Sequence, residues 1–315
     1  MKIQKVLVTG GSGYLGSHIA DALSNKGYVV TILDQKESKY LRSDQEQILG
    51  NINNLNFLKS VLSNFDAVYH MAAIADIDEC HKRPIDTMNV NILGTVKLLE
   101  ACREANIKRF IFASSAYVYS ESGSFYKISK QACEQMVQEY QKLYGIDFVI
   151  LRYGSLYGST RCGLENSIYR TLKQAIEEKK ITYKGTGEEK REFIHILDAA
   201  KLSVEVLNDE YVNQNIILTG SSSIKYSELL LMIKEMMNDS IEIEFEKRKS
   251  SAHYKLTPYS FSPKLGKKLA ANPHVDLGQG LLQLLEELHQ NIFQNINHPI
   301  IKESTSGKTV DMPIS

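Results

Sequence analysis

The sequence predicts an α/β fold, a doubly wound parallel sheet followed by a smaller C-terminal α/β lobe, and two observations predict it. In the first half, short apolar runs rich in β-branched residues alternate with segments of helical periodicity. This order indicates βαβ units, whose strands form a parallel sheet with helices on both faces. The first strand, residues 5–9, also leads through a glycine-rich turn directly into a helix.

The elements of the first half follow one another in a regular order. In residues 14–27, Leu15, Ile19 and Leu23 have helical spacing, and Gly27 is a C-terminal stop. The remaining elements expected here are strands at 28–34, 65–73, 109–115 and 147–154, and helices at 86–106 and 126–145.

The second half is less regular and predicts a second lobe. It contains helical patterns at 167–180, 226–239 and 276–292, a strand at 241–248, and a return to the large sheet at 193–207 and 213–220. The expected division is one domain of residues 1–157 plus about 188–219, a substrate lobe of about 158–187 and 220–295, and a flexible tail at 296–315.

The composition predicts a folded protein without a general affinity for polyanions. Hydrophobic residues make up 43% of the chain, and Lys plus Arg equal Asp plus Glu at 37 each. This balance argues against nucleic acid or an anionic membrane surface as a partner, so any phosphate binding depends on local geometry.

Cysteine usage and the chain start favour a cytoplasmic protein. The four cysteines have neither zinc-finger nor redox spacing, which indicates reduced thiols; they are Cys80, Cys102, Cys133 and Cys162. The sequence begins directly with a strand, and no apolar run approaches the ~20 residues of a membrane span.

Residues 76–81 are rich in acids, but neighbours in a loop rarely converge on one ion. We expect a solvated polar loop there and no metal site.

Three glycines mark a dinucleotide-binding turn of the Rossmann type. Gly10 permits the tight turn, Gly13 allows the backbone to approach a pyrophosphate, and Gly16 allows the helix to pack on the strand. Asp34 ends the next strand, 18 residues after Gly16, where a carboxylate binds ribose hydroxyls. Because that carboxylate repels a 2′-phosphate, the sequence favours NAD over NADP, although two nearby lysines soften the preference.

A serine, a tyrosine and a lysine predict oxidoreductase chemistry. Tyr126 and Lys130 are four residues apart at the start of a helix and share one face, and Ser115 ends the preceding strand. A nearby ammonium favours the phenolate, which can accept a proton from an alcohol as hydride leaves the carbon. Only ten residues separate Ser115 from Tyr126, yet that length easily spans the site. Ser122 or Ser124 is the expected helix cap.

These motifs together resemble one family. From Met1 to about residue 290 the chain is similar to the extended short-chain dehydrogenase/reductases, in the branch of nucleotide-sugar epimerases and dehydratases typified by UDP-glucose 4-epimerase. The resemblance is carried by TGGSGYLG at 9–16, HMAA at 70–73, NILGT at 91–95, SSAYVY at 114–119, YKISK at 126–130, LRYGSLYG at 151–158 and REFIHILDAAK at 191–201.

The resemblance implies roles for individual residues. The implied NAD contacts are Gly10, Gly13, Tyr14, Leu15, Gly16, Asp34, Asn51, Ile52, Met71, Ala72, Ala73, Asn91, Tyr126, Lys130 and Tyr153. Among these, Asn91 anchors the loop of residues 71–73, and Tyr153 lies near the nicotinamide. The implied substrate contacts are Ser115, Ser155, Asn166 and Arg191, the last two for the diphosphate or nucleotide. The family also implies a homodimer.

The chain differs from related dehydratases in the residues that determine which reaction is catalysed. Related 4,6-dehydratases carry an Asp-Glu pair after the active-site residue, but this chain has Ala116 and Tyr117, which cannot perform that elimination. We therefore expect epimerisation of a nucleotide-diphosphate sugar at C4 through a 4-keto intermediate. A nucleotide-sugar dehydrogenase or 4-keto-reductase uses the same residues and stays open, as does a non-catalytic dinucleotide-binding protein. The connection from Ser115 to Tyr126 is shorter than in most relatives, which predicts a more open pocket.

Overall fold

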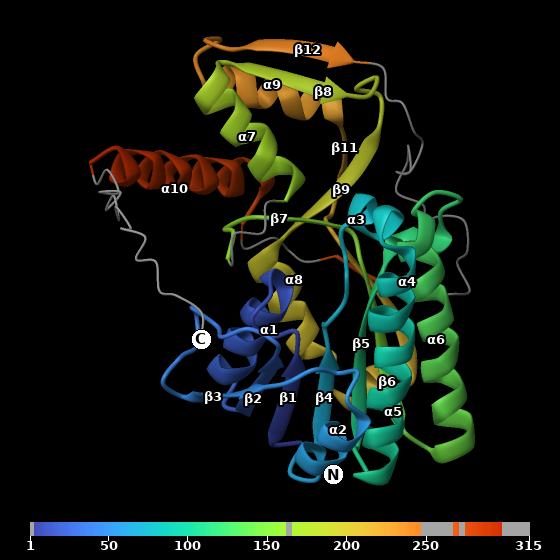
Figure 1. The fold of residues 1–315 in the computed structure, drawn as a ribbon. Helices are drawn as coiled ribbons and strands as arrows, with labels where there is room; N and C mark the ends of the chain where they lie inside the picture. The colour runs from blue at the N-terminus through green and yellow to red at the C-terminus, as the bar shows by residue number, and fades with distance from the viewer. Residues whose placement is uncertain (1–2, 162–165, 247–266, 271–274, 298–315) are drawn as a thin grey trace, which may run out of the picture.

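A parallel sheet of eight strands forms the centre of the larger domain in the computed structural model, which describes residues 3–161, 166–246, 267–270 and 275–297 (Figure 1). The strand order is β13-β10-β6-β5-β4-β1-β2-β3. The bounds are β1 (Lys5–Thr9), β2 (Val29–Asp34), β3 (Gln45–Leu49), β4 (Ala67–His70), β5 (Arg109–Ser115), β6 (Asp147–Tyr153), β10 (Gln214–Thr219) and β13 (Lys267–Ala270). This architecture confirms the expected fold class.

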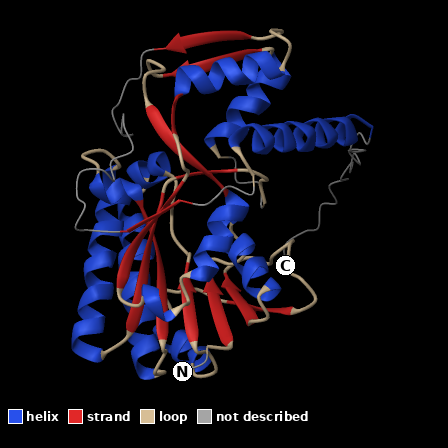
Figure 2. Ribbon diagram, turned by 180° about the vertical axis from the view of Figure 1, so that it is seen from behind, coloured by secondary structure: helices blue, strands red, loops and turns tan. Residues whose placement is uncertain are grey.

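Helices cover both faces of the sheet (Figure 2). The bounds of these helices are α1 (Tyr14–Asn25), α2 (Leu55–Leu62), α5 (Gly94–Glu104), α6 (Ser124–Tyr144) and α8 (Ile196–Glu205). Because side chains alternate along a strand, Val6 and Val8 of β1 join the core beneath α1 and α8, whereas Leu7 joins the core beneath α2, α5 and α6. The fully buried strands are therefore apolar on both sides.

The strand order reverses at β1, and this reversal positions the site. β1 pairs with β2 on one side and with β4 on the other, so the two halves of the sheet wind in opposite directions from it. A crevice opens at such a switch point, outside the carboxyl ends of the strands. The glycine loop after β1 and the chain after β4 meet there.

A second lobe lies above the carboxyl ends of the large sheet (Figure 1). It has a three-stranded sheet, β11-β9-β7, and a two-stranded sheet, β12-β8. Its elements are β7 (Ser155–Tyr157), α7 (Ser167–Glu178), β8 (Lys180–Lys184), β9 (Lys190–His195), β11 (Ser223–Lys225), α9 (Tyr226–Met236), β12 (Glu242–Glu246) and α10 (Leu277–Asn297). A separate core, centred on residues such as Leu172, Leu230 and Leu284, holds it together.

Three strands differ from the expected division. β7 lies inside the range 1–157 expected for the large domain, but it pairs with β9 in the lobe. β9 was expected in the return to the large sheet, but it pairs with β7 and β11 in the lobe. β13 lies inside the range expected for the lobe, but it pairs with β10 at the edge of the large sheet. Strand pairing depends on which edges are free after the chain has packed, and local sequence does not report this. The expected tail lies outside the described residues from position 298 onward.

The segment expected as one helix at 86–106 is divided into three parts. They are α4 (Pro84–Thr87), a π-helix at Met88–Leu93, and α5.

The expected polar loop at 76–81 was wrong: Asp76 accepts a hydrogen bond from Glu79 N and caps a short helix, α3 (Ile77–Lys82). Short 3₁₀-helices follow at Ala116–Tyr119 and Asp209–Tyr211. Within the described ranges, no helix is long and apolar enough to cross a membrane.

Candidate active site

The glycine loop leaves no room for side chains. Gly10 has φ of +71°, and a Cβ added to it would lie 2.6 Å from Ala72 N. A Cβ on Gly16 would lie 2.2 Å from Gly10 O, and one on Gly13 would lie 3.1 Å from the same oxygen. Gly13 is the N-cap of α1 and contributes no side-chain cap. The loop therefore offers bare backbone and a helix N-terminus, the surface that binds a pyrophosphate.

The Asp34 carboxylate is fixed beside this loop. One oxygen accepts a hydrogen bond from Ser12 N at 3.1 Å, and the other accepts one from Lys36 N at 3.1 Å. Ser12 belongs to the glycine loop, so the hydrogen bond couples the end of β2 to it. The arrangement places a negative charge next to the dinucleotide turn.

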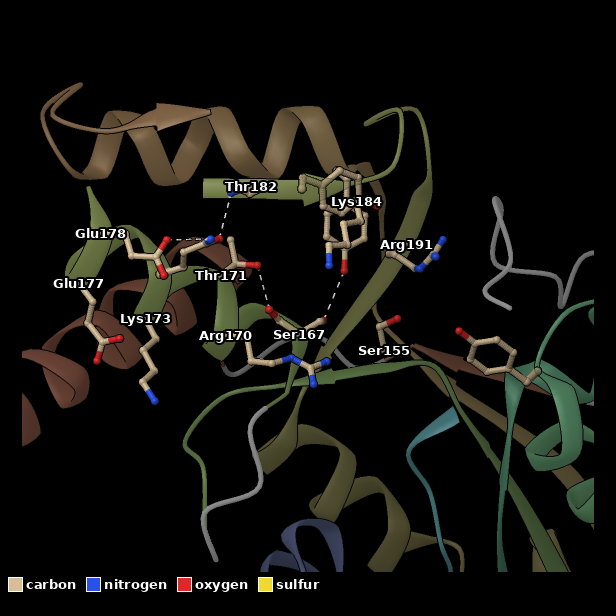
Figure 3. A pocket seen from close by; sticks show the side chains of 14 residues that line it. Ser155, Ser167, Arg170, Thr171, Lys173, Glu177, Glu178, Thr182, Lys184 and Arg191 are labelled. Atoms are coloured by element: carbon tan, nitrogen blue, oxygen red, sulfur yellow. Dashed lines mark hydrogen bonds between the residues drawn. The ribbon is translucent and has the colours of Figure 1, made fainter. Parts of the chain in front are cut away.

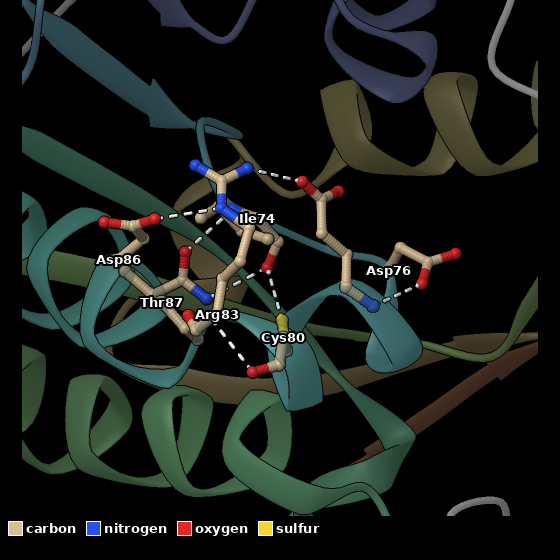
Figure 4. A network of polar contacts seen from close by, with 8 residues as sticks. Ile74, Asp76, Cys80, Arg83, Asp86 and Thr87 are labelled. Atoms are coloured by element: carbon tan, nitrogen blue, oxygen red, sulfur yellow. Dashed lines mark hydrogen bonds and ion pairs between the residues drawn. The ribbon is translucent and has the colours of Figure 1, made fainter.

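Asn91 holds the chain that leaves β4 at Ile74, which Figure 4 shows beside Cys80 of α3. Its Oδ1 accepts from Ile74 N at 2.8 Å, and its Nδ2 donates to Ile74 O at 3.0 Å. The same amide nitrogen donates to Ser129 Oγ on α6 at 3.0 Å. Cys80 Sγ donates to Ile74 O as well. The π-helix thus directs a buried amide toward the loop and toward the helix that carries Tyr126.

Two residues expected at the cofactor, Tyr153 and Ile52, have their side chains in the core. The Tyr153 ring is buried beneath α8, and its hydroxyl lies 2.6 Å from Ser203 Oγ. The Ile52 side chain is buried and packs against Gly94. The neighbouring Asn51 is exposed. Tyr153 ends β6, and Ile52 follows β3. Local sequence does not reveal toward which side of the sheet each side chain points.

The lysine expected to be catalytic lies inside the protein. Lys130 is buried, and its Nζ donates a hydrogen bond of 2.7 Å to Ala113 O, two residues before Ser115. The ammonium lies 4.9 Å from the ring centroid of Phe112 and 5.7 Å from that of Tyr126. Burial lowers the pKa of Lys130 to about 8. At neutral pH the group still carries its proton and presents a positive charge to Tyr126.

Tyr117 connects the other two catalytic candidates. Its backbone N–H donates to Ser115 Oγ at 3.3 Å, and its ring meets the Tyr126 ring edge-on, with centroids 6.4 Å apart. The short connection therefore brings Ser115 and Tyr126 to one neighbouring residue. The expected serine cap was wrong, because Gly123 is the N-cap of α6 and makes no side-chain cap.

A cleft of about 560 Å³ is formed mainly by the second lobe and reaches Tyr117 (Figure 3). Ser155 and Arg191, two of the residues predicted to contact substrate, line it. Sequence reasoning missed the other lining residues, namely Tyr117, Ser167, Arg170, Thr171, Lys173, Gln174, Glu177, Glu178, Thr182, Tyr183, Lys184 and Tyr226. Apart from Tyr117, which follows β5, they come from α7, β8 and the start of α9, and only tertiary packing gathers them.

The cleft combines cations with aromatic rings. Tyr183 and Tyr226 stack with centroids 4.6 Å apart, and the Arg191 guanidinium carbon lies 5.7 Å from the Tyr226 centroid. Arg170 lines the cleft from the first turn of α7. A helix N-terminus and planar guanidinium groups suit phosphate oxygens, and a flat aromatic pair suits a base.

Asn166 joins the lobe to the glycine loop instead of lining the cleft. Its Oδ1 accepts from Tyr169 N at 2.8 Å and caps α7, and its Nδ2 donates to Tyr14 OH at 3.3 Å. The Tyr14 hydroxyl in turn donates to Gly158 O. Leu15 packs partly buried against the core under α1. The described residues hold no group of three or more His, Cys, Asp or Glu placed to bind a metal ion.

Comparisons with known proteins agree with this geometry. A family model described as the NAD dependent epimerase/dehydratase family matches residues 6–218. The UDP-glucuronate 4-epimerase of Thermodesulfobacterium geofontis is 26% identical over 91% of this chain and 96% of its own. A UDP-N-acetyl-alpha-D-glucosaminuronate decarboxylase of Bacillus cytotoxicus is 27% identical over 90% and 97%.

Solved structures are similar over nearly the whole chain. The crystal structure of UDP-glucuronic acid 4-epimerase from Bacillus cereus, in complex with UDP-glucuronic acid and NAD, is 28% identical and has a TM-score of 0.79. The similarity covers 91% of this chain and 100% of that one.

Proposed function

The chain belongs to the NAD-dependent epimerase/dehydratase family, and from this premise we propose that it epimerises a nucleotide-diphosphate sugar at C4 through a 4-keto intermediate. One observation carries the proposal. Lys130 and Tyr126 lie together at the end of β5, and Tyr117 links them to Ser115 and to the cationic cleft. A reacting alcohol and a bound diphosphate can therefore occupy one continuous site.

The residues around the switch point fit NAD. Side chains at Gly10 or Gly16 would collide with backbone, so the loop is kept open for close approach of a pyrophosphate. Asp34 favours ribose hydroxyls and repels a 2′-phosphate, which supports NAD over NADP. When bound, NAD supplies the hydride acceptor for C4 and, once reduced, the hydride donor.

The protein's own residues manage the proton. The Lys130 ammonium favours the phenolate form of Tyr126, which accepts the proton of the 4-hydroxyl as hydride departs from C4. Ser115 donates a hydrogen bond to the same oxygen. The resulting 4-keto sugar turns in the cleft. Hydride then returns to its opposite face while Tyr126 gives the proton back, which inverts C4 with no net oxidation.

The cleft supports a nucleotide-diphosphate substrate. Arg191 and Arg170 supply charge for the diphosphate, and the stacked pair of Tyr183 and Tyr226 offers a surface for the base. Asn166 acts through the α7 N-terminus, which it caps. In this proposal Tyr153 and Ile52 contact NAD through backbone atoms only.

Elimination and decarboxylation are less well supported than epimerisation. Ala116 and Tyr117 stand where acid–base residues are needed for dehydration, although decarboxylases occur among the relatives. A dehydrogenase or reductase remains the alternative because it requires the same Ser115, Tyr126 and Lys130. The two reactions differ in cofactor use: a dehydrogenase or reductase has net cofactor turnover, whereas an epimerase regenerates NAD in each cycle.

We also propose that the enzyme is a cytoplasmic homodimer. Three elements that pack together, α4, the π-helix and α6, expose apolar side chains: Ile85, Leu93 and Ile128 have exposed fractions of 75%, 49% and 48%. Such apolar side chains on adjacent helices are typical of a protein interface. Light scattering coupled to gel filtration measures the oligomeric state, and a monomer at micromolar concentration would contradict the dimer.

The decisive experiment uses the purified, full-length protein. Denaturation releases any bound cofactor for identification, and incubation with a panel of nucleotide hexoses reveals C4 epimers. Epimer formation without added cofactor supports the proposal, whereas stoichiometric NADH supports a dehydrogenase. Tyr126→Phe should lower kcat by roughly 10²–10⁴-fold, the range for lost general acid–base catalysis. Tyr144→Phe, an exposed tyrosine of the same helix, is the matched control.

A further inference from the structure

Tyr117 lies between Tyr126, the proposed proton acceptor, and the cleft. Its ring is half-buried and meets the Tyr126 ring at 79°. It also lines the cleft together with Ser155 and Arg191. Because the Tyr126 hydroxyl must reach the sugar's C4 oxygen, a ring packed against Tyr126 faces the part of the sugar close to C4.

The backbone around Tyr117 is fixed on both sides. Ser114 Oγ donates to Glu134 Oε1 at 2.5 Å, and Gln131 Nε2 donates to Val118 O at 2.7 Å. Tyr119 OH contacts the Arg152 guanidinium, whose carbon also lies 4.8 Å from the Tyr119 ring centroid. Residues immediately before and after Tyr117 are thus attached to α6 and β6.

A buried ion pair supports these attachments. Glu134 accepts from Arg152 Nε at 2.9 Å and from Arg152 Nη2 at 2.6 Å. The two side chains are 8% and 4% exposed, so the pair is shielded from water. Two parallel hydrogen bonds fix both groups geometrically. The segment that presents Tyr117 is therefore anchored rather than free to adapt.

The segment between Ser115 and Tyr126 folds back against the Tyr117 ring at Gly123. Gly123 has φ of +114°, and a Cβ there would lie 2.8 Å from Tyr117 Cδ1 and 2.9 Å from Lys127 Cβ. The chain turns back onto the ring at the only residue type that fits both the conformation and the space. The ten residues between Ser115 and Tyr126 are sufficient because they end against an aromatic side chain.

We propose that Tyr117 is a specificity-determining residue that forms a fixed aromatic wall of the sugar subsite. This inference rests on the proposed function. The ring packs against the apolar C–H face of the pyranose, and its position restricts the substituents on the carbons beside C4. A rigid aromatic ring combines large contact area with little loss of conformational freedom.

The test compares variants of the full-length holoprotein on three sugars. The probes carry the nucleotide preferred by the wild type and differ at C5: xylose has no substituent there, glucose has CH₂OH, and glucuronate has a carboxylate. Tyr117→Ala should change the ratio of kcat/KM between xylose and glucose by roughly tenfold or more, as removal of an apolar packing group does. Tyr117→Phe retains the ring and should preserve the wild-type ratios.

Three measurements separate a wall from a general structural role. Bound NAD and the melting temperature are measured for each variant, and Tyr117→Leu replaces the alanine variant if that protein does not fold. A uniform fall in kcat with unchanged ratios would overturn the proposal. If the wild type epimerises none of the sugars, the proposed function fails. Calorimetric binding of the same three nucleotide sugars then still tests whether Tyr117→Ala alters their relative affinities.

Discussion

Lys130 Nζ donates its hydrogen bond to the carbonyl of Ala113, so the ammonium is attached to the strand that ends in Ser115. The helix that carries Tyr126 is thereby tied to the strand that carries the serine. The charge is buried against Phe112 and the Tyr126 ring. The same contact that positions the three residues also determines how the site responds to pH.

Activity should fall above about pH 8. Burial lowers the pKa of Lys130 to about 8, so the ammonium is lost as the pH rises through this value. Without that charge the phenolate of Tyr126 is less favoured. The measurement is kcat from pH 6 to 10, with Lys130→Arg as a variant that stays charged and should flatten the alkaline limb. A wild-type rate that keeps increasing to pH 10 would disagree.

Removal of one partner of the buried ion pair should destabilise the fold. Glu134→Gln leaves the Arg152 charge buried and uncompensated, which typically costs about 3–5 kcal/mol of unfolding free energy. Urea unfolding measures the loss. The double variant Glu134→Leu/Arg152→Met removes both charges and should recover part of it. Equal stability of the single and double variants would contradict a charge-based cause.

Neutralisation of Asp34 should relax the choice of cofactor. Asp34→Asn keeps an acceptor for Ser12 N but removes the charge that repels a 2′-phosphate. We expect the NADP-to-NAD affinity ratio to rise roughly tenfold, equivalent to about 1.4 kcal/mol. Calorimetric titration of protein freed of cofactor gives both constants. Asp44→Asn, an exposed acid that pairs with Arg42, is the control and should leave the ratio unchanged.

The folded state should lose stability in mild acid because two buried histidines resist protonation. Burial lowers the pKa of His18 to about 4 and that of His70 to about 3, from 6.5. The unfolded chain therefore binds protons first, and stability declines as the pH falls from about 6.5 toward 4. For His18 the full effect is about 3 kcal/mol.

Unfolding free energies at pH 7.0 and 4.5 test this dependence. His70 hydrogen-bonds Thr9 and Thr95 at 2.8 Å each, so His70→Gln preserves polar contacts while it removes the titrating ring. The loss between the two pH values should be smaller in His70→Gln and in His18→Gln. The exposed His289→Gln should behave like the wild type, and an unchanged loss in both buried variants would count against the explanation.

The features that the sequence could predict are local or periodic. The glycine spacing, the acid at the end of β2, and the four-residue spacing of Tyr126 and Lys130 each follow from one turn, strand or helix. The alternation of strands and helices likewise determined the parallel sheet, since few topologies accommodate it. The family resemblance followed from the order of these same segments.

Other features depended on contacts between distant segments. The side chains of Tyr153 and Ile52 point into the core because α8 and α5 cover their respective faces. The edge position of β13 and the lobe position of β9 depended on which strand edges remained free.

By itself the sequence determined the glycine turn after β1 and identified Ser115, Tyr126 and Lys130 as candidates for catalysis, because both follow from residue type and short-range spacing. Only the tertiary structure decided how the ten-residue connection works. The segment that carries Tyr117 is held in place because Glu134 bonds Ser114 and Arg152 bonds Tyr119, while Gly123 packs against the Tyr117 ring. Packing of this kind joins residues whose separation along the chain carries no periodic signal, so it becomes visible only once the chain is folded.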